Sequence, residues 1–373
     1  MPDISKPISQ KPRVHIVRTH GVPARYGGFE TLADFLCQYL ADEFDITVYC
    51  NAHKYPEQPK EYHGAKLVYI KIEANGFKGI FYDLITYVMA LARSDIILYL
   101  SPVGSGYMTP LKFLSKAKVL VNHGGLNEWE REKLTWFEKK WAKFNHRVAA
   151  RFSDVNIVDN ELYRGSLKDN FDADSIVIRY GGDHATKIAA DHAALASKYP
   201  FVKEQYAVSV VRAQLDNNIH LLLEAFEDFD RFKLVVVSNW DVSSYGKELK
   251  KRYSNRDNMI LLDAIYAKDE LDFVRGNGYL YIHSHSRCGT APSLVEAMSL
   301  GQAILSFDVA TNRETTEGKA FFFQDAASLK KVLLGLSDEA IAANRSEMKR
   351  ISGSKYRWEV ISKQYSELMN RFG

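Results

Sequence analysis

Short apolar runs alternate with helical patterns along the first half of the chain. Between the first two runs, Leu32, Leu36 and Leu40 recur with Phe35 at helical spacing, which predicts an amphipathic crossover helix. Strands without strict polar alternation are typical of a parallel sheet that is covered on both faces. The runs lie at 14–17, 45–50, 66–72, 95–100, 118–122, 154–159 and 175–180.

The same pattern restarts after the paired glycines of 179–185. Further apolar runs lie at 206–211, 233–238, 259–262, 279–284 and 303–307, with a helical segment through 220–226. The chain is therefore predicted to be an α/β protein with two doubly wound, Rossmann-like domains. We place them at 1–183 and 184–355, and expect a helix in 356–373 to pack back toward the first domain.

Length and composition agree with this organisation and restrict the function. A chain of 373 residues suits two cores, and a net charge of +3 gives no reason to expect a nucleic-acid partner. Its three cysteines, Cys37, Cys50 and Cys288, form no CxxC pair, which is typical of a reducing compartment. With no signal-peptide pattern and no run of 18 apolar residues, a cytoplasmic protein is expected.

Residues 289–298, GTAPSLVEAM, follow a predicted strand and open a helical pattern. Gly289 allows close approach to the backbone, Thr290 can cap the helix, and Pro292 is tolerated in a first helical turn. Amides near Ser293 and Leu294 would remain free to bind an anion. The stretch is therefore predicted to bind a diphosphate, although an ordinary strand-to-helix turn is an alternative.

Charged residues near this turn and near a second glycine-rich turn extend the prediction. Glu296 lies too far inside the helix to cap it, and its carboxylate suits the hydroxyls of a ribose. In 21–32, Gly27 and Gly28 precede the first helix and Glu30 falls in its first turn. Arg212 follows a strand and could neutralise a diphosphate, or could be a surface charge.

Five motifs in order resemble those of the retaining glycosyltransferases of family 4, and among these most of all bacterial polysaccharide rhamnosyltransferases. They lie at 23–31, 122–133, 281–285, 289–298 and 308–314. The resemblance covers nearly the whole chain and implies the GT-B fold. It also implies transfer of L-rhamnose from dTDP-rhamnose to a lipid-linked or oligosaccharide acceptor in cell-surface polysaccharide synthesis, with peripheral membrane contact and without cofactor or metal.

The resemblance assigns roles to individual residues. Arg212 would hold the diphosphate and act in catalysis. His123 would also act in catalysis, because it falls where the wider family has a histidine at the donor sugar. A structural role for His123 is the alternative. The donor-binding set is Gly27, Gly28, Arg212, Asn217, His285, Gly289, Thr290, Ser293, Leu294 and Glu296. The acceptor-binding set is Glu30, Glu128, Trp129 and Arg131.

Three positions depart from the family pattern, and they weaken the donor assignment most. Cys288 replaces the first glutamate of the E-x7-E pair, so His285 or Arg287 could replace its contact. Asn217 stands where a lysine usually follows the diphosphate-binding arginine. Residues 124–129 read GGLNEW where the closer relatives have D-G-L-E-W, which leaves an acidic role there open. A UDP-sugar donor, a non-hydrolysing nucleotide-sugar 2-epimerase and a sugar-nucleotide sensor without turnover are the alternatives.

Three other patterns carry competing interpretations. The acidic pairs Asp172/Asp174 and Asp228/Asp230 resemble metal-binding DxD, but they precede strands, away from the expected site. Segment 128–152 places Phe137, Trp141, Phe144, Val148 and Phe152 on one helical face, with lysines outside it. We predict a core helix with a solvated back; a membrane-surface helix is the alternative. The stretch 104–109 lacks the context of a dinucleotide fingerprint.

Overall fold

The structure is a computed structural model that describes residues 11–25, 27–73, 76–125, 127–130 and 134–372. The chain divides into two compact units. The N-terminal unit contains the described residues up to Val158, Tyr163–Ile178 and the chain from Ser362 onward. The C-terminal unit contains Asp159–Leu162 and Arg179–Ile361.

An eight-stranded sheet forms the centre of the N-terminal unit, in the order β3-β4-β2-β1-β5-β6-β7-β8. Only β3 is antiparallel to its neighbour. The strands are β1 Arg13–Val17, β2 Asp45–Asn51, β3 Glu61–Tyr62, β4 Ala65–Ile70, β5 Ile96–Leu100, β6 Lys118–Asn122, β7 Val155–Val158 and β8 Ile176–Val177. Every residue of β5 is buried, as expected of a strand covered on both faces.

Helices cover this sheet and connect its strands. The α-helices are α1 Gly28–Leu40, α2 Gly76–Leu91, α3 Met108–Leu111, α4 Trp136–Phe152 and α5 Glu161–Phe171, and the 3-10 helices are η1 Ser105–Tyr107, η2 Lys112–Leu114 and η3 Glu128–Glu130. In α1 the predicted stripe is buried at Leu32, Leu36 and Leu40, and the acidic Glu30 falls in its first turn. This pattern confirms the amphipathic crossover helix.

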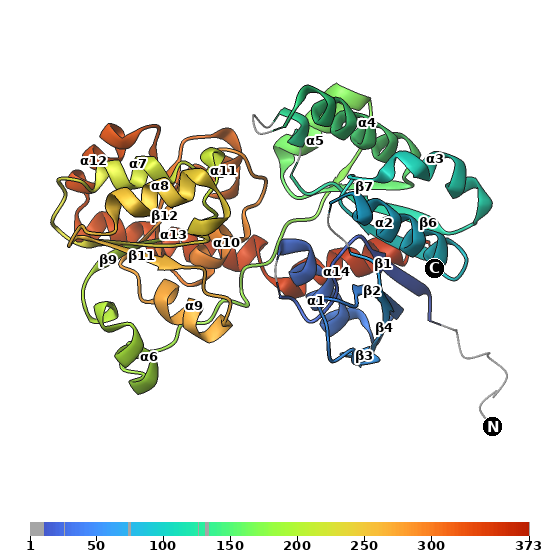
Figure 1. Ribbon diagram of the computed structural model, residues 1–373, viewed down its shortest axis with the longest axis horizontal. Helices are drawn as coiled ribbons and strands as arrows, with labels where there is room; N and C mark the ends of the chain where they lie inside the picture. Colours follow the sequence, from blue (N-terminus) through green and yellow to red (C-terminus); the bar gives the residue numbers. More distant parts are fainter. Residues whose placement is uncertain (1–10, 26, 74–75, 126, 131–133, 373) are drawn as a thin grey trace. The chain divides into compact units, whose positions relative to one another are not determined.

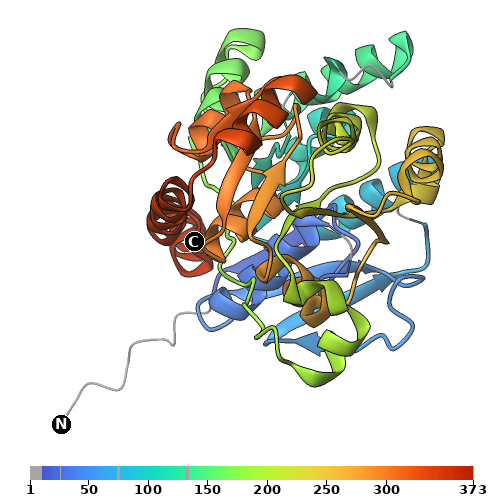
Figure 2. The same cartoon turned by 90° about the vertical axis from the view of Figure 1, so that its left-hand side faces the viewer.

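The C-terminal unit contains a fully parallel sheet of six strands in the order β11-β10-β9-β12-β13-β14. Figure 2 shows β12 and β13 as parallel orange arrows. The strands are β9 Tyr206–Val210, β10 Lys233–Ser238, β11 Met259–Asp263, β12 Leu280–His283, β13 Ala303–Phe307 and β14 Phe321–Phe323. Two parallel α/β units confirm the predicted fold class.

Helices lie on both faces of this second sheet: Figure 1 shows α7, α8 and α12 on one face and α9 on the other. The helices are α6 Ala193–Lys198, η4 Pro200–Lys203, η5 Leu215–Asn217, α7 Ile219–Ala225, η6 Trp240–Val242, α8 Ser244–Tyr253, α9 Lys268–Gly276, α10 Pro292–Ser299, α11 Ala310–Thr315, α12 Ala326–Gly335, α13 Asp338–Lys355 and α14 Trp358–Met369. None of the helices in the described ranges combines the length and the apolar character needed to cross a bilayer.

Helix α14 belongs to both units. Its first residue, Trp358, packs on Tyr180 of the C-terminal unit with ring centroids 4.8 Å apart. From Ser362 onward the helix is part of the N-terminal unit, where Asn122 donates a hydrogen bond to the Tyr365 hydroxyl at 2.8 Å. The unit boundary therefore falls inside a helix.

Candidate active site

The carboxyl ends of β9 and β12, which pair side by side, lead into two loops of the C-terminal unit that are tied together. Ser286 donates both its backbone N–H and its hydroxyl to the carbonyl of Asp216, at 3.1 and 2.8 Å. The Asn218 side chain donates to the carbonyl of Ser284 at 3.0 Å. Ligands of open parallel sheets bind at this edge, where loops leave the strands.

Helix α10 begins at Pro292, as the sequence predicts, but its cap differs from the expectation. Ala291 is the N-cap residue, and the Thr290 hydroxyl instead donates to the carbonyl of Asp159 at 2.5 Å. The Leu294 amide donates to the Ala291 carbonyl at 3.0 Å and is not free, because the first turn closes on itself. The expectations of a Thr290 cap and a free Leu294 amide are therefore wrong.

Glu296 lies at the centre of a buried charge network. Its Oε1 lies 3.0 Å from Nε2 of His184, and its Oε2 pairs with the guanidinium of Arg275, which is only 3% exposed. Asp272 holds the other side of that guanidinium at 2.8 Å. Burial alone would raise the pKa of Glu296, but the charge of Arg275 and the hydrogen bond with His184 lower it to about 2.

This network changes the expected consequence of removing Glu296. From the sequence alone, Glu296→Ala would affect nucleotide binding and leave the fold intact. The structure shows instead that this carboxylate neutralises a buried arginine, so its removal leaves a poorly compensated charge in the core. The backbone packs closely beside this network, because a Cβ on Gly182 would lie 2.4 Å from the carbonyl oxygen of Val295.

The three residues His184, Arg275 and Gly182 were not predicted as part of the site. The sequence signal for Gly182 was present in the paired glycines of 179–185, which were interpreted only as a strand end. No sequence motif marks Arg275, because it lies in a different helix from Glu296 and 21 residues before it. Only the tertiary structure brings their charges together.

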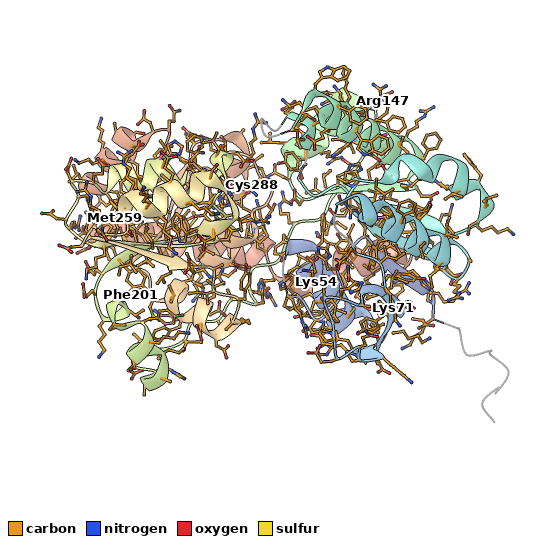
Figure 3. The ribbon with its side chains drawn as sticks, viewed as in Figure 1. Lys54, Lys71, Arg147, Phe201, Met259 and Cys288 are labelled. Atoms are coloured by element: carbon orange, nitrogen blue, oxygen red, sulfur yellow. The ribbon has the colours of Figure 1, made fainter. Side chains whose placement is uncertain are left out.

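A stack of rings extends along β12 to the position of Cys288. The rings of His283 and His285 are stacked with centroids 4.5 Å apart, and Tyr281 continues the stack at 6.4 Å from His283. Burial and the neighbouring His285 lower the pKa of His283 well below its usual value. Cys288, labelled in Figure 3, places its Sγ 3.7 Å from Nε2 of His283 and 3.7 Å from Oδ1 of Asn312.

The motif at 308–314 holds these loops in place. The Asn312 side chain donates to the carbonyls of His285 and Phe307, at 3.0 and 2.9 Å. Arg313 forms a two-point ion pair with Asp308. Glu314 accepts hydrogen bonds from Arg179 at 2.7 Å and from Asn160 at 2.9 Å. The motif thus fixes the conformation of the loop that follows β12.

Arg212 is exposed at the end of β9, and its backbone is held by Asn217. The Asn217 side chain is buried and donates to the Arg212 carbonyl at 2.9 Å, while the backbone carbonyl of Asn217 accepts from the Ser284 hydroxyl at 2.5 Å. The position expected to carry a donor-binding lysine thus supports the loop that presents Arg212. Both residues lie in the two linked loops that follow β9 and β12, which we call the loop pair.

In the N-terminal unit, the glycine-rich turn and the segment after β6 lie against each other. Gly27 is extended and caps α1, which begins at Gly28. Gly124 has a positive φ of 57°, and a Cβ there would lie 2.7 Å from the ring of Phe29. Glu30 is buried, and one of its oxygens accepts from the backbone N–H of His20 at 3.2 Å. Its carboxylate therefore shapes the loop before the helix.

His123 is buried rather than open to solvent. It is 2% exposed, and its Nε2 lies 2.8 Å from Oδ1 of Asn156; burial lowers its pKa to about 4. Trp129 is also buried, with its ring against His146 and Phe171 at 4.9 and 5.5 Å, so the expected contact of its ring with an acceptor does not fit its surroundings. Among the other expected acceptor residues, Glu128 has a described backbone only, and Arg131 lies outside the described residues.

The buried histidines make a testable contribution to pH dependence. Burial lowers the pKa of His146 to about 3, so the unfolded chain takes up a proton below about pH 6.5 that the folded protein does not. Stability is therefore lost as the pH falls from 6.5 toward 3. Between pH 6.5 and 4.5 this group should account for roughly 2 to 3 kcal/mol.

His146→Phe, which keeps an aromatic ring beside Trp129, should make the unfolding midpoint less sensitive to acid. Urea unfolding at pH 7, 5.5 and 4.5 would measure this slope. His53→Phe, a change at an exposed histidine, is the control and should behave as wild type. Equal slopes for His146→Phe and wild type would contradict the assignment.

Three of the four aspartates of the acidic pairs lie beside lysines, and a cavity of the C-terminal unit lies away from the loop pair. Lys168 holds Asp172 at 2.7 Å and Asp174 at 3.3 Å, and Lys330 lies 3.7 Å from Asp228. Within the described residues, no cluster of His, Cys, Asp and Glu could hold a metal ion. A cavity of about 240 Å³, whose lining includes Gly278, Gln302 and Arg345, lies where β12 and β13 begin, at the opposite edge of the sheet.

Comparison with known proteins agrees with this description. Residues 193–348 match the family "Glycosyl transferases group 1", and residues 11–183 match a domain of unknown function, DUF1972. No curated protein sequence matches the chain.

Solved structures resemble it over nearly its full length. A sucrose-phosphate synthase from Thermosynechococcus elongatus aligns with a TM-score of 0.81 at 16% identity, over 97% of this chain and 99% of that one. HepE from Anabaena, in complex with UDP and glucose, gives 0.76 at 16%, over 96% and 100%. A glycosyltransferase from Rickettsia africae gives 0.71 at 13%, over 98% and 99%.

The fold and the matched domain define the class of this chain: it is a glycosyltransferase with the GT-B fold. The glycosyl transferases group 1 match covers β9 to most of α13, and so contains the loop pair, Arg212 and α10.

Proposed function

We propose that the protein transfers a sugar from a nucleotide-diphosphate donor and retains the configuration of the anomeric carbon. The proposed sugar is L-rhamnose, and the proposed donor is dTDP-rhamnose. The observation that carries the proposal is the loop pair of the C-terminal unit. Arg212 is exposed at the end of β9, and α10 begins after the adjacent strand β12. A guanidinium and the positive end of a helix at one sheet edge suit a diphosphate.

The donor contacts follow from this edge. Arg212 would neutralise the diphosphate, and Gly289 and Ser293 would let its oxygens approach the start of α10. Glu296 keeps its negative charge at neutral pH because its pKa is about 2. Each carboxylate oxygen has two lone pairs, so the oxygens that face His184 and Arg275 can still accept hydrogen bonds from ribose hydroxyls.

The proposed chemistry requires no protein nucleophile. The bond from the anomeric carbon to the diphosphate oxygen breaks as the acceptor oxygen attacks on the same face, and the leaving phosphate takes the acceptor proton. Arg212 and fixed dipoles then stabilise the charge that develops on the leaving group. In this proposal the N-terminal unit supplies the acceptor side through Gly27, Gly28 and Glu30. His123 is proposed to act at the donor sugar, with its buried ring held in place by the hydrogen bond with Asn156.

The acceptor in this proposal is a lipid-linked or oligosaccharide saccharide, used at the cytoplasmic face of the membrane in bacterial cell-surface polysaccharide synthesis. A UDP-sugar donor is the second candidate, because HepE was solved with UDP and glucose. The 2-epimerase alternative gains no support from the histidines of the site. His123 and His283, which have depressed pKa values, are both buried.

Calorimetric titration of dTDP-rhamnose, UDP-glucose and UDP-rhamnose distinguishes these donors, followed by turnover assays with polyprenyl-diphosphate saccharides. The proposal expects tightest binding of dTDP-rhamnose and release of dTDP only when an acceptor is present. Binding of a UDP-sugar alone would shift the donor to the second candidate. Epimerised donor without acceptor, or binding without any turnover, would overturn the transferase proposal.

A further inference from the structure

Helix α4 exposes large aromatic side chains that a core helix would bury. Trp136 is 73% and Phe137 70% exposed, and Trp141 and Phe144 are exposed as well. Only the C-terminal half of the helix reaches the core, through Val148 and Ala149. The prediction of a core helix is therefore wrong for the first half of α4, where three of the five residues on the supposed core face lie open.

Neighbouring segments extend the apolar surface. Helices α2, α3 and α4 all pack on one hydrophobic cluster of the N-terminal sheet, so their outer sides face the same way. Phe113 of η2, 75% exposed, lies against Phe152 of α4 with ring centroids 6.4 Å apart. Most of the exposed large hydrophobic side chains among the described residues lie here: Ile80, Phe81, Ile85, Val88, Phe113, Leu114, Trp136, Phe137, Trp141 and Phe144.

Cationic side chains surround these aromatics. Helix α4 carries Lys139, Lys140, Lys143 and Arg147 among its exposed or half-buried residues, and Figure 3 labels Arg147 on this helix. Its only acidic residue, Glu138, is used in the capping box with Thr135. The stretch 105–118, which contains η2, has no acidic residue at all. We call these cations, with Phe113, Leu114, Trp136, Phe137, Trp141 and Phe144, the aromatic-basic patch.

We propose that the aromatic-basic patch is the surface by which this protein docks on anionic lipid bilayers. Tryptophan and phenylalanine insert at the boundary between headgroups and acyl chains, while lysine and arginine contact the phosphates of anionic lipids. The absence of exposed acidic side chains on α4 beyond its capping residue gives the charge complementarity. A second copy of the chain fits poorly, because two such patches would bring like charges together.

The assignment rests on the exposed side chains and does not depend on the sugar or on the acceptor. It specifies a helix lying in the membrane interface, since α4 is too short and too polar to span. The two exposed tryptophans of the described chain, Trp136 and Trp141, are both on α4, whereas the other three of the protein, Trp129, Trp240 and Trp358, are buried. Quenching of tryptophan fluorescence by a quencher in the lipid therefore reports this patch selectively, because the buried tryptophans emit but are shielded from it.

The test measures binding of the full chain to vesicles of phosphatidylglycerol and phosphatidylethanolamine, with phosphatidylcholine vesicles for comparison. Wild type should sediment with the anionic vesicles, and brominated phosphatidylglycerol should quench its fluorescence. Trp136→Phe/Trp141→Phe should remove the quenching but keep the binding. Lys139→Gln/Lys140→Gln/Lys143→Gln and Trp136→Ser/Phe137→Ser should each weaken binding by about tenfold or more.

A matched control changes exposed hydrophobic residues elsewhere: Val242→Ser/Tyr266→Ser, in the C-terminal unit, should bind vesicles as wild type does. Equal binding by the patch variants and the control would overturn the proposal. Failure of wild type to bind anionic vesicles would also overturn it, whether the patch is then found to mediate self-association or binding of single-stranded nucleic acid. Circular dichroism confirms that each variant is folded.

Discussion

Glu296→Gln is expected to lower the free energy of unfolding of the C-terminal unit by roughly 3 kcal/mol. The amide cannot neutralise Arg275, which is buried and keeps only Asp272 as its anionic partner. Urea unfolding followed by circular dichroism would measure the loss. Hydrogen exchange of peptides from α9 and α10 would show whether it originates at this network.

The effect should depend on pH with a defined sign. The folded-state pKa of Glu296 lies near 2, below its usual value of 4.5, so its stabilisation is complete above about pH 4.5 and is lost as the pH falls toward 2. The difference between Glu296→Gln and wild type should therefore shrink in acid. Glu248→Gln, at an exposed glutamate of α8, is the matched control and should have little effect at any pH. An equally stable Glu296→Gln protein at pH 7 would refute the network.

Arg212→Ala is expected to reduce sugar transfer by about 100- to 1000-fold, the range seen when one group that stabilises a developing oxyanion is removed. Arg212 is exposed, and only its backbone carbonyl is held by Asn217, so the fold should be unaffected. Release of nucleotide diphosphate with donor and acceptor present would measure the rate. Arg212→Lys should recover part of it, because a lysine restores charge but not two-point contact.

The control for Arg212→Ala is Arg256→Ala, an exposed arginine of the same unit. That variant should transfer sugar at the wild-type rate. If Arg212→Ala also kept the wild-type rate, the diphosphate would have to be held elsewhere. A drop shared by both variants would indicate a general effect of surface charge.

Apolar runs predicted most of the fold because buried parallel strands need little except continuous hydrophobic side chains. The run at 233–238 became β10, and that at 303–307 became β13. The short strands β3 and β14, of two and three residues, were not predicted. They complete sheet edges, and such short pairings depend on neighbours rather than on a pattern of their own.

The loops proposed as the candidate site could be located from the sequence, but their contacts could not. Motifs indicated that turns follow the strands β9 and β12 and that a helix begins at Pro292, since turn residues act locally. The partners of Glu296 and the burial of His123 depend on residues distant in sequence, and no spacing rule contains them. For α4 the helical period was right, but period alone cannot distinguish a face that meets the core from one that meets solvent.

The shared helix α14 has a consequence for synthesis on the ribosome. The N-terminal unit is the first to be translated, yet Asn122 and Glu43 cannot form their hydrogen bonds with Tyr365 and Ser366 until the end of the chain is made. The Ser366 hydroxyl donates to Glu43 at 2.5 Å. Those residues are translated only after all six strands of the second sheet. The domain that starts emerging earliest is thus the one finished latest, and nascent chains arrested before residue 362 should hold it in an incompletely packed state.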